Sequence, residues 1–115
     1  MTIGLKIFPA AFYQSARGHE PVKEWLLGLE KDDRRTIGED IRTVEFGWPL
    51  GMPLCRSLKH GLWEVRSNIS DGRIARTIFA AVDGRMVLLH GFIKKSRATP
   101  KADLDLARKR LNEVT

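Results

Sequence analysis

The stretch Leu62–Arg97 reads LWEVRSNISDGRIARTIFAAVDGRMVLLHGFIKKSR and decides the fold. It contains three runs rich in Val, Ile, Phe and Trp, separated by Asp71-Gly72 and Asp83-Gly84. A two-residue Asp-Gly loop favours the type I′ turn of a β-hairpin, because both residues tolerate a positive φ. The stretch therefore predicts an antiparallel three-stranded meander that contains the core.

The turn at Asp83-Gly84 also predicts a register for the last two strands. If Val82 faces Arg85, Arg76 lies opposite Gly91, and Arg73 lies opposite Lys94. The expected core face then carries Ile74, Arg76, Ile78, Ala80, Val82, Val87, Leu89 and Ile93. The opposite face carries Arg73, Thr77, Phe79, Leu88, His90, Phe92 and Lys94.

Arg76 is the unusual residue on the predicted core face, because an uncompensated buried charge is very costly. Two interpretations stay open. Arg76 either pairs with an acidic residue such as Glu64 in a purely structural role, or directs its planar guanidinium at a phosphate.

The rest of the chain predicts elements that cover or flank the meander. Residues Ile3–Phe8 are short, apolar and β-branched, and predict a strand that ends before Pro9. Two helices follow, the first beginning at Pro21 and the second capped by Asp32 or Asp33 and stopped at Gly47-Trp48-Pro49. Residues 48–61 are expected to form a loop, and Thr99 to cap a last helix opened by Pro100.

These elements predict a single α+β domain over residues 1–115, in the order β-α-α-β-β-β-α. The sheet is expected to be largely antiparallel, with the helical pair on one face. No apolar run approaches the ~20 residues that span a bilayer, and the first residues lack the pattern of a signal peptide. With one cysteine, Cys55, no internal disulfide can form, so a cytoplasmic protein is expected. Cys55 is predicted to be a small buried residue rather than a nucleophile.

The net charge of +6 is distributed unevenly along the chain. Residues 1–50 contain seven Lys and Arg against eight Asp and Glu, whereas residues 51–115 contain thirteen against six. A basic second half with cations interleaved among strand residues favours a surface that binds a polyanion such as nucleic acid. The alternative is a solvated basic face that only keeps the protein soluble.

No strong catalytic motif is present: the chain lacks HExxH, a Cys-x-x-Cys pair, a phosphate-binding glycine loop and GxSxG. The histidines His19, His60 and His90 are scattered, so neither a metal site nor a cofactor is expected. His90 is predicted to be a strand histidine that bonds to a neighbour, with a general base as the alternative.

Several segments carry a resemblance to a known family. They are GLWEVR (61–66), the run DGRIARTIFAAVDGRMVLLHGFIKKSRATPKADLDLARKRL (71–111), EPVKEWLLGL (20–29) and DIRTVEFGWPLGMPL (40–54). Together they resemble the HigB-like, phage-derived branch of the RelE/ParE toxin superfamily, over nearly the whole chain.

The resemblance implies a RelE-like fold and a type II toxin neutralised by a helix-turn-helix, HigA-like antitoxin. Members on the RelE side enter the ribosome and cleave mRNA without a metal, by attack of the 2′-hydroxyl on the adjacent phosphate. Members on the ParE side inhibit DNA gyrase, so that target stays open. A decayed toxin retained as an antitoxin-binding module is the third alternative.

The resemblance also implies roles for individual residues. Arg66 matches a basic strand position, Arg76 matches the arginine that contacts the scissile phosphate, and Lys95, with Lys94 beside it, stands where another catalytic arginine is found. The other cations predicted to bind RNA are Arg56, Lys59, Arg73 and Arg97. Arg76→Ala is expected to abolish growth arrest and leave the fold intact.

The chain departs from the family pattern at two places that concern the general base. The strand lysines of RelE-like members are replaced here by Leu62 and Glu64, and no tyrosine follows the last strand, since the only tyrosine is Tyr13. Glu64, His90 and Lys94 are the candidates that remain.

Overall fold

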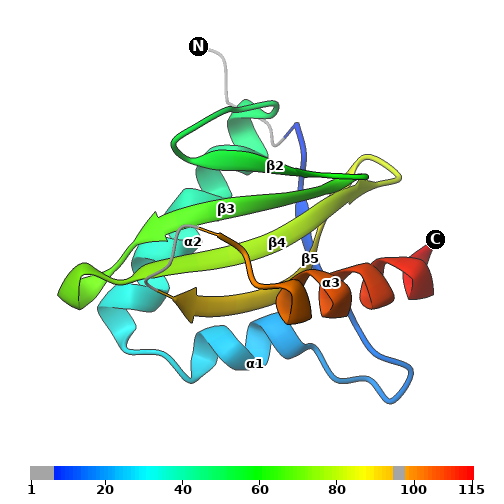
Figure 1. The fold of residues 1–115 in the computed structure, drawn as a ribbon, viewed down its shortest axis with the longest axis horizontal. Helices are drawn as coiled ribbons and strands as arrows, with labels where there is room; N and C mark the ends of the chain where they lie inside the picture. The colour runs from blue at the N-terminus through cyan, green and yellow to red at the C-terminus, as the bar shows by residue number, and fades with distance from the viewer. Residues whose placement is uncertain (1–6, 95–97) are drawn as a thin grey trace, which may run out of the picture.

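A five-stranded sheet forms the middle of three layers in the computed structural model, which describes residues 7–94 and 98–115 (Figure 1). The strands lie in the order β1-β5-β4-β3-β2. Their bounds are β1 Ala10–Phe12, β2 Cys55–Lys59, β3 Leu62–Asn68, β4 Ile74–Val82 and β5 Arg85–Lys94. Short β1 runs parallel to β5, and all other neighbours are antiparallel.

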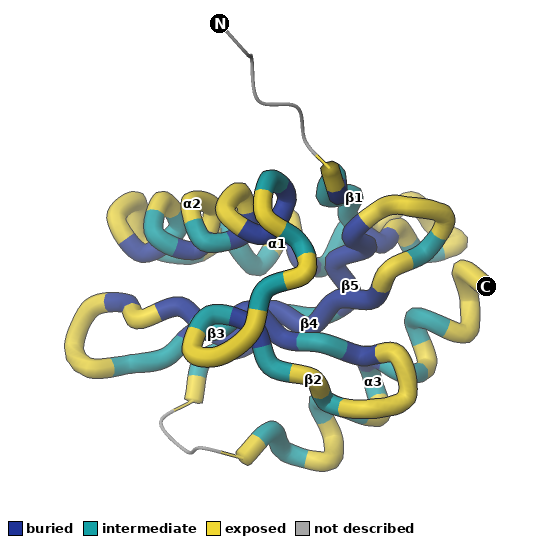
Figure 2. The backbone as a smooth tube through the Cα atoms, turned by 90° about the horizontal axis from the view of Figure 1, so that it is seen from above, coloured by how far each residue is buried: buried dark blue, intermediate teal, exposed yellow. Residues whose placement is uncertain are grey.

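Helices cover both faces of the sheet. Helices α1 (Pro21–Leu27) and α2 (Lys31–Gly47) lie on one face, and α3 (Lys101–Val114) lies on the other (Figure 2). None of the helices within the described part of the chain is long and apolar enough to cross a membrane. The arrangement confirms the predicted α+β class and is compatible with a RelE-like fold.

The predicted meander is confirmed as β3, β4 and β5. At the β4–β5 turn, Asp83 and Gly84 have φ values of 50° and 75°, as a type I′ turn requires. A single 3₁₀ turn, Ser70–Gly72, joins β3 to β4. The two Asp-Gly pairs therefore do set both reversals of the chain.

One strand prediction lies mostly outside the described residues, and one loop prediction was wrong. Most of the strand expected at Ile3–Phe8 falls outside the described residues, and the edge strand that the structure describes begins after Pro9, at Ala10. The loop expected over residues 48–61 contains β2, which pairs with β3. The prolines and glycines around this five-residue run predicted a loop, but the run forms a strand because it pairs with β3.

The predicted helix caps were also wrong. Glu30 precedes α2 and Pro100 precedes α3, and neither end has a capping side chain among its hydrogen bonds. The Asp33 carboxylate and the Thr99 hydroxyl bind partners in other segments of the fold, Ser70 and Glu64 respectively.

The predicted register between β4 and β5 holds near the turn and fails beyond it. Val82 faces Arg85 as expected, but a β-bulge between Phe79 and Ile78 shifts the pairing by one residue. The resulting pairs beyond the bulge are Ile78↔His90, Thr77↔Gly91, Arg76↔Phe92 and Ile74↔Lys94. An extra residue in one strand reverses the alternation, so the expected pairs Arg76–Gly91 and Arg73–Lys94 are not formed.

Each face of the sheet has its own core. The core under α1 and α2 consists of Phe8, Val22, Ile37, Ile41, Val44, Cys55, Val65, Ile69, Ala75, Phe79, Met86 and Leu88. The core under α3 consists of Tyr13, Leu62, Ile78, Ala80, Val87, Leu89, Phe92 and Ala107. The sequence predicted one core face, whereas the structure has a core on each face of the sheet. Because of the bulge, Phe92 belongs to the core under α3.

Gly91 lies where α1 meets the sheet. A Cβ atom on Gly91 would stand 2.2 Å from Cε3 of Trp25, so the indole ring occupies the space that any side chain would need. Gly91 is therefore explained by packing on α1, and not by an arginine opposite it.

Gly91→Ala is expected to destabilise the fold by about 1–3 kcal/mol, the usual cost of overpacking a well-filled core. The measurement is urea unfolding. Gly38→Ala is the matched control, because a Cβ there meets nothing within 4 Å in the middle of α2, and helix propensity predicts a gain of up to about 1 kcal/mol. Equal midpoints for the two variants would contradict the close contact with Trp25.

Candidate nucleic-acid interface

Three arginines and one glutamate lie together on the α3 face of the sheet. Arg56 of β2 pairs with Glu64 of β3, and Arg66 of β3 pairs with Arg76 of β4. Directly opposed residues share a face, and residues two apart in a strand do so as well, which brings all four side chains to the same side. We call Arg56, Glu64, Arg66 and Arg76 the arginine cluster.

Burial differs sharply within the arginine cluster. Arg76 and Glu64 are each 0% exposed, whereas Arg56 and Arg66 are half-buried. Burial lowers the pKa of the Arg76 guanidinium, Glu64 opposes that shift, and Arg66 and Arg56 add to it. The buried Glu64 carboxylate therefore stabilises the charge on Arg76, as the structural interpretation of Arg76 requires.

Glu64 also has a hydrogen-bond partner in Thr99. The Thr99 hydroxyl donates a hydrogen bond of 2.7 Å to Oε2 of Glu64. The contact joins β3 to the segment just before α3, and it explains why Thr99 does not cap that helix. With three guanidinium groups and one carboxylate, the arginine cluster has an excess of positive charge.

His90 and Asp103 form a second polar pair on the same face. The imidazole Nε2 lies 2.6 Å from Oδ1 of Asp103, which projects from the first turn of α3. The His90 ring stacks on Phe92 at 5.5 Å between centroids, and Phe92 is the strand partner of Arg76. The expectation of a strand histidine bonded to a neighbour is confirmed, and the bulge explains why that neighbour comes from α3.

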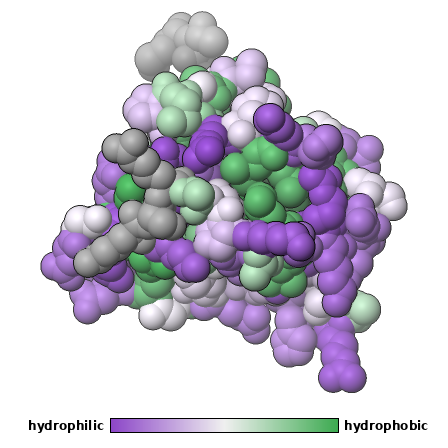
Figure 3. All heavy atoms as spheres, viewed as in Figure 1, coloured by the Kyte–Doolittle hydropathy of each residue, from purple (hydrophilic) through white to green (hydrophobic). Residues whose placement is uncertain are grey.

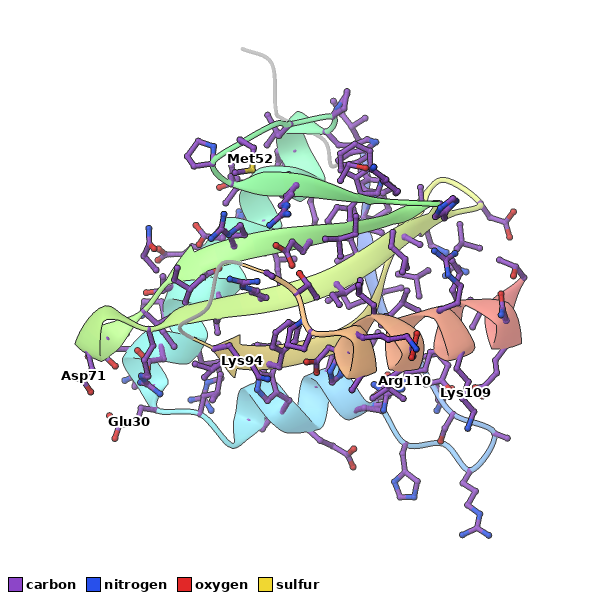
Figure 4. The ribbon with its side chains drawn as sticks, in the orientation of Figure 1. Glu30, Met52, Asp71, Lys94, Lys109 and Arg110 are labelled. Carbon is purple, nitrogen blue, oxygen red and sulfur yellow. The ribbon has the colours of Figure 1, made fainter. Side chains whose placement is uncertain are left out.

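Two of the other predicted cations lie at strand ends in the described structure. Lys94 ends β5 as an exposed side chain (Figure 4). Lys59 ends β2 and lines, with Arg56, a pocket beside Thr99. Lys95 and Arg97 lie outside the described residues.

Arg73 has a structural partner remote from the arginine cluster. Its Nη2 lies 2.8 Å from Oδ2 of Asp33, and the same carboxylate accepts hydrogen bonds from the backbone N–H and the hydroxyl of Ser70. These contacts fasten the β3–β4 turn to the first turn of α2. They give Arg73 a role in the fold that its RNA-binding prediction did not include.

Asp33→Asn is expected to lower stability at neutral pH, and the loss is expected to shrink in acid. The hydrogen bond from the backbone of Ser70, aided by the Ser70 hydroxyl and Arg73, lowers the pKa of Asp33 below its ordinary 3.8. A lowered carboxyl pKa contributes stability above the unfolded pKa, and that contribution disappears as pH falls through the folded pKa. The melting temperatures of the wild type and of Asp33→Asn, measured from pH 7 to pH 2.5, test this prediction. A difference in melting temperature that stays constant over this range would contradict it.

Tyr13, the one tyrosine, lies at the far end of α3 from His90. Its hydroxyl donates to a Glu113 carboxylate oxygen. The guanidinium of Arg110, which projects from α3 (Figure 4), stands 5.5 Å from the Tyr13 ring centroid. Ten residues of helix separate Glu113 from Asp103, about 15 Å along the axis. Tyr13 therefore does not replace the tyrosine that the family carries after its last strand.

Cys55 is buried in β2, and burial raises the pKa of its thiol to about 11. The neutral thiol is a poor nucleophile, which agrees with the prediction of a small buried residue. Across residues 7–94 and 98–115, no three His, Cys, Asp or Glu side chains come together in a group that could hold a metal ion.

Comparison with known proteins places these features in a family. No curated protein matches the chain. A family model described as phage derived protein Gp49-like (DUF891) matches residues 24–112, a span that includes the arginine cluster, His90 and Asp103. The chain therefore belongs to the Gp49-like family of phage-derived proteins, a toxin-like family of the RelE/HigB type.

Proposed function

We propose that the protein is the toxin of a type II toxin–antitoxin system and cleaves mRNA on the ribosome without a metal ion. The observation that carries the proposal is the arginine cluster, which gathers three guanidinium groups on one face beside the His90–Asp103 pair. Guanidinium groups bind phosphate oxygens through two parallel hydrogen bonds and stabilise negative charge that develops there.

In the proposed reaction, the 2′-hydroxyl of one nucleotide attacks the phosphate that follows it. A base removes the 2′-hydroxyl proton, a bond forms from O2′ to phosphorus, and the bond to the next 5′-oxygen breaks. The products are a 2′,3′-cyclic phosphate and a 5′-hydroxyl, which takes up a proton. The protein must therefore supply cations for the phosphate oxygens and a group that accepts the first proton.

Arg66 is the best-placed cation for the phosphate. It is half-buried rather than enclosed, and its buried Nε has no hydrogen-bond partner among the residues that the structure describes. A buried polar group without a partner costs about 1–3 kcal/mol. A hydrogen bond from this N–H to a phosphate oxygen would therefore remove that cost. Arg76, being fully buried, is assigned to supporting the charge and position of its neighbours.

His90 is the best-placed base. With the Nε2 proton donated to Asp103, the lone pair of the imidazole is on Nδ1, where it can accept a proton. The carboxylate stabilises the imidazolium that forms. Glu64 is enclosed and already accepts from Thr99, and Lys94 is an exposed side chain at the end of β5, so both are weaker candidates.

The burial of Arg76 also favours a second candidate function, in which nothing is cut. Arg76 matches the arginine that contacts the scissile phosphate in RelE-like enzymes, but here it is fully buried and does not reach solvent. A protein without that contact suits an inhibitor of a target such as DNA gyrase, or a decayed toxin that only binds its antitoxin. In either function, we propose a cytoplasmic protein whose partner is a HigA-like, helix-turn-helix antitoxin.

Mapping of mRNA 5′ ends after brief induction tests the proposal. The wild-type protein is expected to create clustered ends inside translated frames, and Arg66→Ala to reduce cleavage roughly 10²–10³-fold, as for loss of an oxyanion donor. Arg85→Ala is the control, because Arg85 is an exposed residue at the start of β5. Altered supercoiling with intact mRNA would support the inhibitor, and antitoxin binding without growth arrest would support the decayed toxin.

A further inference from the structure

A pocket opens between β2 and the segment that leads into α3. Its volume is about 240 Å³. Seven residues line it: Arg56, Ser57, Leu58, Lys59, Ala98, Thr99 and Leu104. The face seen in Figure 3 carries a hydrophobic patch that hydrophilic side chains surround.

The walls of the pocket are fixed by the fold. Arg56 and Leu58 alternate onto the α3 face of β2, and Leu58 and Leu104 both pack against the core under α3. Thr99 is held by its hydrogen bond to Glu64. Helix α3 is itself fastened by Arg108, whose Nη1 donates to the His60 carbonyl at 2.6 Å.

The lining combines three kinds of chemistry. Leu58 and Leu104 offer apolar surface to a flat group. The Thr99 hydroxyl offers a hydrogen bond, because its oxygen can still accept one while its proton is donated to Glu64. Arg56 and Lys59 bring two positive charges to the rim. A nucleotide has the matching parts: a flat base with polar edges, attached to a phosphate.

The volume and position of the pocket limit the kind of ligand that it can bind. Sites for drug-sized ligands measure about 300–1,000 Å³, so 240 Å³ suits one base rather than a larger molecule. Arg56 belongs both to the pocket and to the arginine cluster. A group in the pocket therefore lies beside an anion on the cluster, as the base and the phosphates of one chain do.

We infer that this pocket binds one unstacked nucleobase of a single-stranded nucleic acid, with the flanking phosphate on Arg56 and Lys59. Proteins commonly read single strands by taking splayed bases into such sites while cations follow the backbone. The inference rests on the proposed function for RNA as the source of the base. It adds a subsite that would determine which nucleotide lies next to the cleaved phosphate.

Methyl NMR titrations test the inference without relying on cleavage. The probes are the four nucleoside 5′-monophosphates, ribose 5-phosphate and inorganic phosphate. At least one nucleotide is expected to shift the Leu58 and Leu104 methyl signals and to bind roughly 5- to 150-fold more tightly than ribose 5-phosphate, the range that base stacking supplies. Equal shifts and affinities for ribose 5-phosphate would overturn the base site.

Two variants distinguish the binding of the base from the binding of the phosphate. Leu58→Ala is expected to remove the preference for nucleotides and to leave the affinity for inorganic phosphate unchanged. Lys59→Ala is expected to weaken the binding of all phosphate-bearing probes by the same factor. Lys101→Ala is the matched control, since Lys101 is an exposed lysine that does not line the pocket. If Leu58→Ala proves unstable in urea, Leu104→Ala serves in its place, because Leu104 is the other apolar residue of the lining, and unchanged nucleotide preference in a folded variant would overturn the inference.

Two further probes identify the source of the base. Preference for a ribo- over a deoxyribo-tetranucleotide identifies RNA, and equal binding identifies any single strand. An acidic peptide that shifts the same methyl signals while nucleotides do not would overturn the site in favour of a protein partner. Base binding without mRNA cleavage would refute only the proposed function, whereas cleavage without base binding would refute only the pocket.

Discussion

Arg76→Ala is expected to destabilise the folded protein by about 3–5 kcal/mol, the usual cost of removing one partner from a buried charge pair. Arg76 is 0% exposed and lies beside Glu64, which is 0% exposed as well. The truncation opens a cavity and leaves the enclosed carboxylate with less compensating charge. Small domains have only about 5–15 kcal/mol of stability, so the variant is expected to lose much of it. Urea unfolding measures the change.

A double-mutant cycle shows whether the charge pair is the cause. Arg76→Met combined with Glu64→Gln removes both charges, keeps an acceptor for Thr99, and is expected to recover part of the loss. Arg85→Ala is the control, with an expected change within about 0.5 kcal/mol because Arg85 is exposed. An unchanged urea midpoint for Arg76→Ala would mean that Glu64 does not depend on Arg76.

The same burial corrects the sequence-based expectation that Arg76→Ala leaves the fold intact. Loss of growth arrest in that variant can follow from unfolding alone, so it does not identify a phosphate contact. Arg66 gives a clearer test, because its half-buried side chain can reach a ligand with less disturbance of the core. Functional tests of the cluster should therefore begin with Arg66.

Much of the fold could be predicted because local signals determine it. The Asp-Gly pairs need a positive φ, Pro21 suits a first helical turn, and each predicted helix has one apolar face. The bulge in β5 could not be predicted, since no residue type marks it and the apolar run continues on both sides. One inserted residue was enough to exchange the faces of Gly91 and Phe92.

The site was less predictable than the fold, because its key contacts join distant segments. Thr99 reaches Glu64 across 35 residues and Asp103 reaches His90 across 13, and both contacts depend on how α3 and the residues just before it pack on the sheet. Asp103 carried only a weak signal, an acidic residue near a helix start. The approach of Arg56 to Arg66 and Arg76 depends on β2, a strand that the sequence did not predict.

If the protein cleaves RNA as proposed, His90→Ala is expected to reduce the rate about 10²–10⁴-fold, the usual contribution of a general base. Since His90 and Asp103 are bonded at 2.6 Å, Asp103→Asn is expected to show a smaller loss. The asparagine oxygen still accepts from Nε2, but it lacks the charge that stabilises the imidazolium. Single-turnover cleavage of a defined mRNA on ribosomes measures both variants.

Binding must be measured beside the rate, because His90 also packs on Phe92. A base acts in the chemical step, so His90→Ala should lower kcat and leave KM and the melting temperature nearly unchanged. His90→Gln, which keeps polar bulk but cannot accept the proton as a base, should be as slow as His90→Ala. A His90→Gln variant with the wild-type rate would exclude proton transfer by His90 and return the role to Glu64 or Lys94.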